Sequence, residues 1–291
     1  GNLPPLAWAL ATGGTPYAGD IFSGGTITNG DVWNERIRDD FIGEGLDSEN
    51  FAHGGAEVLA DSFGGIAPGL ENQVTERLNS DDDRGSRPLV SIWAGANDMI
   101  EAIELDTSAA IAQQAADKIK TEIERMFAEG FRDFVVFNLP DLSSTPRYSL
   151  FEPLLNPAAA QATMLFNDAL ESNLMMVETD DLNIIDFDVD AGFDALLAQA
   201  DLLGINEVLF PCVFPTEAGG FRCSDTTGGE ADNRFFIDAV HPNRIVHEQI
   251  GVQFEERVLN DGLVPVPLPL PAGMLLGGVA LLGAIRLTRK H

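Results

Sequence analysis

The sequence predicts an α/β protein whose parallel sheet is covered by helices on both faces. Short apolar runs, each followed by a polar loop, alternate along the chain with longer segments whose apolar residues recur at helical spacing. Strands and helices that alternate in this way form parallel sheets, because each crossover helix packs on a face of the sheet. Sites in such sheets lie at the carboxyl ends of the strands.

Three segments are expected to be strands. Residues 88–93 form an apolar run that enters a loop of small and polar residues, and residues 134–139 form a second run that Pro140 stops. In residues 185–190, apolar residues alternate with aspartates. This alternation is typical of a strand with one exposed face.

Three long helices are expected between and after these strands. The first lies between Thr107, which can cap it, and Gly130, which can end it. The second covers about residues 157–177, and the third begins after Pro242.

The composition is that of a globular protein with an unusual charge. The 291 residues allow one large domain or two small ones, and 45% hydrophobic with 22% charged residues excludes a disordered chain and a multi-span membrane protein. Seventeen basic against 46 acidic residues give a net charge of −29. Binding to duplex nucleic acid needs a basic face, so we expect no nucleic-acid partner.

The chain divides into a domain of residues 1–260 and a tail of residues 261–291. Residues 262–285 carry no charge and open with alternating prolines, which form a stiff extended spacer. A short apolar run and a basic cluster of residues 286–290 follow. This order predicts a segment held in a membrane with its cationic end in the cytoplasm, although a buried C-terminal helix is the alternative.

The tail resembles the bacterial PEP-CTERM group of sorting signals, in its Val-Pro-Leu-Pro-Ala variant, on residues 266–273. The resemblance implies export, processing by an exosortase-type enzyme as a partner, and delivery to the cell envelope, the cell surface or the extracellular matrix.

Cys212 and Cys223 are the only cysteines, and their spacing suits neither a zinc site nor a redox pair. In an exported protein they are expected to form one disulfide, which would stabilise the fold by about 2–3 kcal/mol. Two free buried thiols are the alternative.

One short motif can supply a general base. Asp238 lies three residues before His241 at a turn that enters a helix, so its carboxylate can approach the imidazole. Such a contact selects the tautomer and stabilises the imidazolium that a base forms. By itself the motif favours a structural Asp–His pair over a catalytic one.

Two further segments can supply hydrogen-bond donors. The small residues around Gly55 allow a backbone amide to face a ligand, or they form only a tight turn. Asn97, at the end of the first predicted strand, can donate to a developing oxyanion or can form an Asx turn.

Taken together, these segments resemble the SGNH family of hydrolases, and within it the GDSL-type esterases and lipases. The resemblance covers about residues 1–258 and extends to residues 29–33 and 138–141. It implies a flavodoxin-like three-layer sandwich and hydrolysis of lipid or small acyl esters without a cofactor or metal. It assigns His241 as base, Asp238 as its partner, and Gly55 and Asn97 as the oxyanion hole. The closest similarity is to bacterial enzymes called phospholipase, lecithinase or hemolysin.

The first motif of that family, Gly-Asp-Ser-Leu with the nucleophile, is absent. Gly1-Asn2-Leu3 resembles its end, so we expect the serine and the first strand to precede this chain, which is then inactive as given. Ser23, Ser62 and Ser91 lack the context of a nucleophile. The alternative is a non-catalytic cell-surface or matrix protein that uses the same scaffold for binding.

Overall fold

The computed structural model describes residues 27–43, 48–62, 67–80, 87–214, 221–225 and 228–261. Residues 262–291 of the predicted tail, Ser23 and the segment that resembles the end of the nucleophile motif lie outside the described residues.

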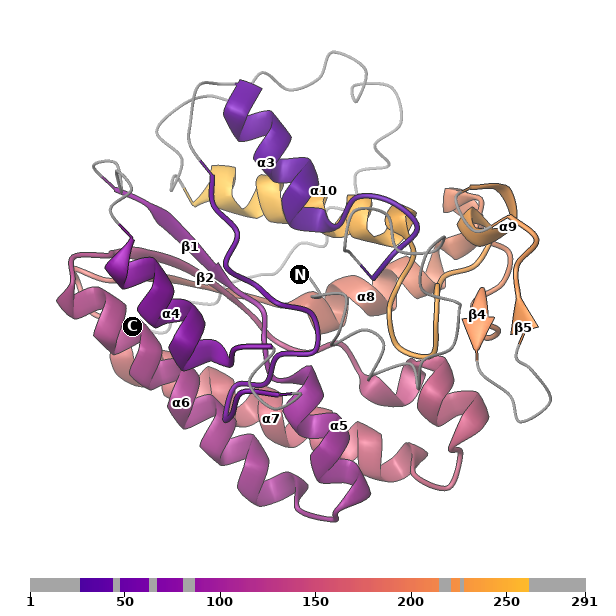
Figure 1. Cartoon of the computed structure of the whole chain (residues 1–291), viewed down its shortest axis with the longest axis horizontal. Helices are drawn as coiled ribbons and strands as arrows, with labels where there is room; N and C mark the ends of the chain where they lie inside the picture. Colours follow the sequence, from indigo (N-terminus) through magenta and orange to yellow (C-terminus); the bar gives the residue numbers. More distant parts are fainter. Residues whose placement is uncertain are drawn as a thin grey trace, which may run out of the picture.

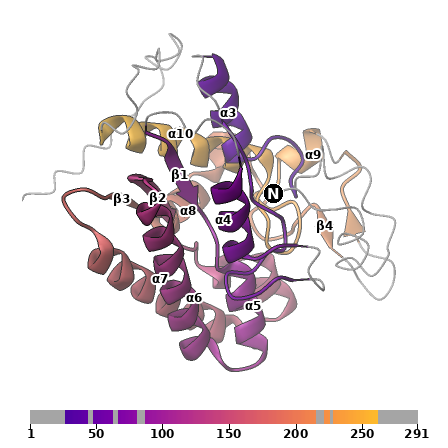
Figure 2. The same ribbon diagram turned by 60° about the vertical axis from the view of Figure 1, so that its left-hand side comes forward.

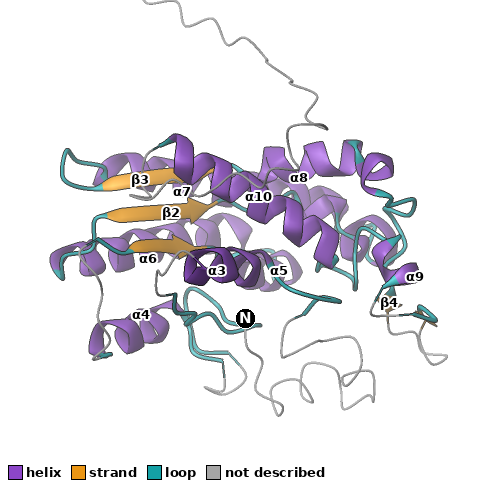
Figure 3. Ribbon diagram, turned by 90° about the horizontal axis from the view of Figure 1, so that it is seen from above, coloured by secondary structure: helices purple, strands orange, loops and turns teal. Residues whose placement is uncertain are grey.

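The centre of the fold is a parallel sheet of β1 (Leu89–Ile92), β2 (Asp133–Phe137) and β3 (Asn183–Phe187), in that order. Figure 3 shows the three strands side by side and pointing the same way. All three predicted strands are therefore confirmed.

The third strand ends earlier than its alternating pattern predicts. Val189 starts α8 (Val189–Ala198) instead of continuing β3, because Asp188 accepts a hydrogen bond from the Ala191 N–H at 3.1 Å and caps the helix.

Helices cover both faces of the sheet, which gives the predicted three layers (Figures 1 and 2). One face carries α4 (Leu70–Asn79), α5 (Ala96–Glu104), α6 (Ser108–Ala128) and α7 (Asn156–Val177). The other carries α3 (Trp33–Gly43), α8 and α10 (Arg244–Asn260). The shorter elements are η3 (Leu142–Ser144), η4 (Arg147–Phe151), η5 (Ala200–Leu203), β4 (Val213–Phe214), β5 (Phe221–Arg222) and α9 (Gly229–Asp232).

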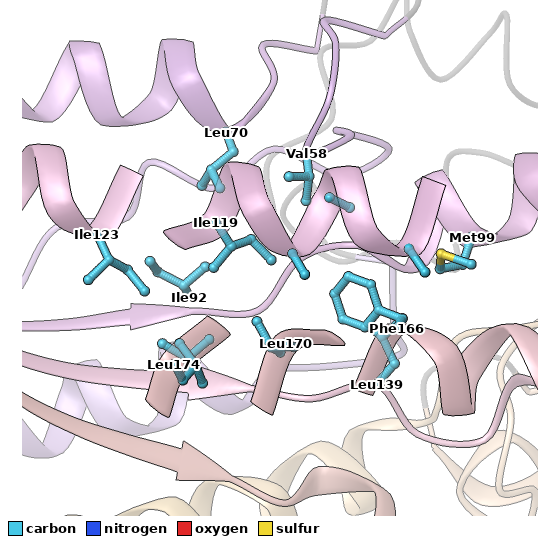
Figure 4. Packing of buried hydrophobic residues seen from close by; sticks show 14 of the residues in the cluster. Val58, Leu70, Ile92, Met99, Ile119, Ile123, Leu139, Phe166, Leu170 and Leu174 are labelled. Atoms are coloured by element: carbon cyan, nitrogen blue, oxygen red, sulfur yellow. The ribbon is translucent and has the colours of Figure 1, made fainter. Parts of the chain in front are cut away.

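Strand β2 shows why the fold needs helices on both faces. Phe134 and Val136 enter the hydrophobic core under α6 and α7, whereas Val135 and Phe137 enter the core under α3 and α10. Alternate residues of a strand point to opposite faces, so an entirely apolar strand is stable only when both faces are buried. Figure 4 shows the first core, with Ile119 close to Ile92 of β1.

The three predicted long helices are confirmed, with one difference at an N-terminus. Thr107 precedes α6, but its side chain makes no capping hydrogen bond. At the other end Gly130 has φ +99°, a left-handed conformation that favours glycine and stops the helix. None of the helices in the described part of the chain is long and apolar enough to cross a bilayer.

Candidate active site

The structure brings the predicted base and its partner into contact. Nδ1 of His241 lies 2.8 Å from Oδ2 and 3.0 Å from Oδ1 of Asp238. Oδ1 also accepts the backbone N–H groups of Val240 at 2.9 Å and of His241 at 2.7 Å. One carboxylate therefore holds both the backbone of the turn and the imidazole ring. The contact with the carboxylate assigns the ring proton to Nδ1 and leaves Nε2 as a hydrogen-bond acceptor.

The pair shifts both titrations in the direction that general-base catalysis needs. Burial acts to raise the pKa of Asp238, but the charge and hydrogen bonds of His241 and the two backbone N–H groups hold it below its usual range. Burial acts to lower the pKa of His241, but the Asp238 carboxylate raises it above its usual range. The imidazolium that forms on proton transfer is thus stabilised.

Asn243 anchors the turn that carries His241. Its side chain is fully buried and accepts the Val246 N–H at 2.9 Å, which caps α10. Its amide donates to the carbonyl oxygens of Arg234 at 2.6 Å and Asp232 at 3.2 Å. The start of α10 and the chain before Asp238 are therefore joined through one side chain.

A second anchor, which we call the clamp, consists of Asn29, Asp232 and Arg244. The Asn29 amide donates to Asp232 at 2.9 Å, and its oxygen accepts the Arg244 backbone N–H at 2.9 Å. The Arg244 guanidinium makes two bonds, of 2.8 and 2.5 Å, with the Asp232 carboxylate. The sequence analysis associated residues 29–33 with the family but did not predict this contact.

The disulfide between Cys212 and Cys223 is confirmed, with a Cα–Cα distance of 5.1 Å. The Cys212 N–H donates to Phe236 at 3.0 Å, and the Val213 N–H donates to Ile237 at 2.8 Å. The disulfide-bonded β4–β5 hairpin thus braces the segment that leads to Asp238.

Gly55 lies in a turn with φ +79°, which favours glycine. Its carbonyl accepts the Ser62 hydroxyl at 2.5 Å. Its N–H makes no hydrogen bond to any other described residue, so it is available as a donor.

Asn97 and the neighbouring Asp98 tie α5 to the Gly55 turn. Nδ2 of Asn97 donates to the Ala56 carbonyl at 2.8 Å. An asparagine amide has two N–H groups, so one fixes the side chain and the second can serve a ligand. The buried Asp98 carboxylate accepts the N–H groups of Val58 at 2.8 Å and Leu59 at 3.0 Å. The sequence pattern did not predict this role of Asp98, which makes two hydrogen bonds between the two segments.

The two halves of the site lie at the carboxyl ends of the strands. Asn97 follows β1, and Arg147, in the segment after β2, donates its backbone N–H to Ala239 at 2.8 Å and pairs with Glu104 of α5. Within the described residues, no hydrogen bond joins His241 directly to Asn97. The halves are connected through the segment after β2.

The serines that the sequence analysis considered do not complete the site. The Ser62 hydroxyl is bound to Gly55, and Ser91 is exposed within β1. No serine in the described ranges is hydrogen-bonded to His241. On its side away from β2, β1 has no partner strand among the described residues.

Two other histidines are partly or fully buried. His53 is partly buried, and its Nδ1 has no hydrogen-bond partner among the described residues. His247, in the first turn of α10, is buried with Nδ1 also unpartnered, and burial together with the His241 charge lowers its pKa to about 3. His247 is thus neutral and apolar in character. No group of three or more His, Cys, Asp or Glu in the described part of the chain is arranged to hold a metal.

A base with a carboxylate partner, together with two hydrogen-bond donors, is the set of groups that acyl transfer uses. The family model of GDSL-like Lipase/Acylhydrolase matches residues 11–254.

Three curated proteins are similar in sequence. The chain is 28% identical over 194 residues (65% of this chain, 56% of the relative) to phosphatidylcholine-sterol acyltransferase of Aeromonas hydrophila. It is 26% identical over 245 residues (77% and 66%) to a GDSL lipase of Tanacetum cinerariifolium. It is 30% identical over 136 residues (45% and 30%) to the secreted effector protein SseJ of Salmonella typhimurium. The matches thus span less than two thirds of each relative. The family match, which covers most of the sequence, shows that this chain belongs to the GDSL-like lipase and acylhydrolase family.

Proposed function

We propose that this chain is the larger part of an exported serine ester hydrolase that acts on lipid esters. The family supports ester hydrolysis in general. The observation that carries the finer proposal is the contact of 2.8 Å between His241 Nδ1 and Asp238, which presents Nε2 of a carboxylate-supported imidazole.

In the proposed reaction, a serine hydroxyl attacks the ester carbonyl carbon while Nε2 of His241 accepts its proton. Asp238 stabilises the imidazolium, and the oxyanion receives hydrogen bonds from the Gly55 N–H and the second N–H of Asn97. The tetrahedral intermediate expels the alcohol, which takes the proton from His241. Water then repeats the sequence on the acyl-enzyme, and the carboxylic acid leaves.

We propose that the nucleophile is supplied by chain that precedes Gly1. The Gly-Asp-Ser-Leu motif is absent from the sequence, and no described serine contacts His241. The unpaired side of β1 supports a further strand there, because β2 is buried at every position whereas Ser91 of β1 is exposed. A strand in that place would end beside Asn97.

The substrate class follows from the relatives, one named for phosphatidylcholine and another a lipase. Export and transient anchoring to the membrane follow from the tail, through an exosortase-type enzyme that would cleave it at the cell envelope. Residues 1–260 would then be the released or displayed hydrolase.

The first test is the coding sequence upstream of Gly1, followed by labelling of the natural protein with a fluorophosphonate. We expect an upstream Gly-Asp-Ser-Leu motif and one labelled serine within it, with labelling reduced in a His241→Ala variant. A start codon directly before Gly1, or labelling that no variant of His241 changes, would overturn the proposal. The chain would then be the non-catalytic surface or matrix protein.

A further inference from the structure

We propose that the tip formed by Val208, Leu209 and Phe210 inserts into the surface of an uncharged lipid aggregate beside the active site. The inference rests on the proposed function for its biological meaning, but the contact itself is independent of catalysis. On either side of the tip, residues 207, 212 and 213 form backbone hydrogen bonds with residues 235–237. Residues 235–237 lead directly to Asp238.

The tip exposes three consecutive apolar side chains. Val208, Leu209 and Phe210 are 41%, 39% and 44% exposed. Isolated exposed apolar residues are common on protein surfaces, but a contiguous group indicates a contact surface.

Part of the tip backbone is hydrogen-bonded to neighbouring side chains, which favours insertion into lipid. One oxygen of Glu207 accepts the N–H groups of Leu209 at 2.9 Å and Phe210 at 3.0 Å. Arg234 donates to the carbonyl oxygen of Phe210 at 3.0 Å and approaches that of Pro211 at 3.4 Å. Polar backbone groups that are already paired lower the cost of leaving water.

The base of the tip is held by a backbone hydrogen bond, a disulfide and an ion pair. Phe235 donates its N–H to Glu207 at 2.8 Å, Cys212 is held by the disulfide, and Arg234 forms an ion pair with Glu230 at 3.2 Å. The apolar side chains therefore project from a fixed support, so little conformational entropy is lost when they bind.

The small size of the tip and the net charge of the chain decide which kind of partner the tip can bind. Three side chains are too few for a stable protein interface, which buries about 800 Å² on each partner. The net charge of −29 opposes contact with anionic membranes and with a second copy of this chain. The binding partner that these two arguments leave is a surface of zwitterionic or neutral lipid. The tip would contact this surface next to His241.

The test uses a dye that reports only on its own position. Cys212 and Cys223 are bonded to each other, so Leu209→Cys in the full chain offers one free thiol for an environment-sensitive dye. Met176→Cys is the matched control. It is 65% exposed in the last turn of α7, which leads to the amino end of β3 and hence to the opposite edge of the sheet.

Phosphatidylcholine vesicles should shift the dye at position 209 to the blue and shield it from an aqueous quencher at least about threefold, while the dye at 176 stays unchanged. Because the dye is local, this readout does not depend on attachment through the tail. An unchanged dye at 209, or equal changes at both positions, would overturn the proposal. A change at 209 that follows protein concentration without vesicles would also overturn it, because a second copy would then cover the tip.

A pair of charge-matched double variants gives a second readout. Leu209→Asp with Phe210→Asp should weaken binding to phosphatidylcholine vesicles about tenfold or more, whereas Met175→Asp with Met176→Asp should change it less than about twofold. Equal binding by both pairs would contradict insertion through the tip.

Hydrolysis of the water-soluble ester p-nitrophenyl acetate by the natural protein separates this inference from the proposed function. The tip variants should leave it unchanged. If the parent protein does not hydrolyse this ester, the proposed esterase function is refuted and the lipid contact of the tip is not. If hydrolysis is normal but the dye at position 209 does not respond, only the lipid contact of the tip is refuted.

Discussion

The candidate site has two halves, a proposed base half around His241 and a proposed oxyanion half around Asn97, and they are built in opposite ways. Asp238 and His241 are three residues apart and meet through local geometry, with both backbone and side-chain bonds to one carboxylate. Asn97 and Ala56 are 41 residues apart and meet only because α5 packs against the Gly55 turn. A local half can be recognised from spacing alone, whereas a half assembled from distant segments needs the fold.

The halves also differ in how they are held. The base half is anchored from outside by the clamp, Asn243 and the disulfide hairpin. The oxyanion half is held mainly by the buried Asp98, whose pKa is raised by burial despite its two backbone donors. The geometry of the base half should therefore change when distant residues are substituted. The geometry of the oxyanion half should change only when residues of its own two segments are substituted.

The largest effect is expected from His241→Ala in the natural protein. The turnover rate should fall by about 10⁴-fold or more, because His241 is the only histidine in the described ranges whose ring is hydrogen-bonded to a carboxylate. The fold should persist, since the ring is 40% exposed. Ester hydrolysis and circular dichroism check both points, with His53→Ala as the control. A loss smaller than about tenfold would remove His241 as the base.

Asn97→Ala tests the other half and should cost about 3 kcal/mol in the transition state, or about 10²- to 10³-fold in kcat, with little change in KM. Asn50→Ala is the control, because Asn50 also holds the backbone of this segment, at 2.9 Å to the Ala52 N–H, but lies outside the proposed oxyanion hole. Equal kcat values for the two variants would exclude Asn97 from the oxyanion hole.

Asp232→Ala tests whether the base half depends on its distant anchor. Loss of the bonds to Asn29 and Arg244 should lower the free energy of unfolding by about 1–3 kcal/mol and reduce kcat severalfold. Urea denaturation and ester hydrolysis give the two numbers. Asp261→Ala, which removes an exposed ion pair with Arg257 at 3.0 Å, should change the stability by less than about 1 kcal/mol. Equal losses for the two variants would mean that the clamp has no special role.

The smallest effect concerns His247 and the dependence of stability on pH. Its pKa is about 3 in the folded protein against about 6.5 in the unfolded chain, so between these values the unfolded state binds more protons. The stability contribution is complete above pH 6.5 and is lost as the pH falls, by at most about 1.4 kcal/mol per unit. His247→Phe should remove this part of the slope in urea titrations at several pH values. An unchanged slope would show that His247 titrates normally.

The sheet and the long helices could be predicted because their signals are local. An apolar run such as β2, or the proline in the first turn of α7, needs no knowledge of the rest of the chain. The prediction was wrong at Val189, where the alternating pattern continues but the Asp188 cap starts a helix. A capping residue and the last residue of a half-exposed strand can both be aspartate, so the pattern could not separate them.

The site residues could be proposed from the sequence, but their anchors could not. Asp232 and Arg244 carry no local signal in a chain with 46 acidic residues, and their roles follow only from their contact with Asn29. Asp98 adjoins a predicted site residue, but its buried contacts lie 39 and 40 residues away. The choice among many equivalent carboxylates is made by the tertiary structure.

The clamp also determines when, during synthesis of the chain, the candidate site can be assembled. Asn29 and Asp232 are separated by 203 positions, and at about 5–20 residues per second a ribosome needs about 10–40 s to make the chain between them. In the last part of that interval the three strands have been made, but the turn that carries His241 has not. The clamp therefore forms only after Asp232 and Arg244 have both been made, and a chain that stops before them lacks the anchor of the His241 turn.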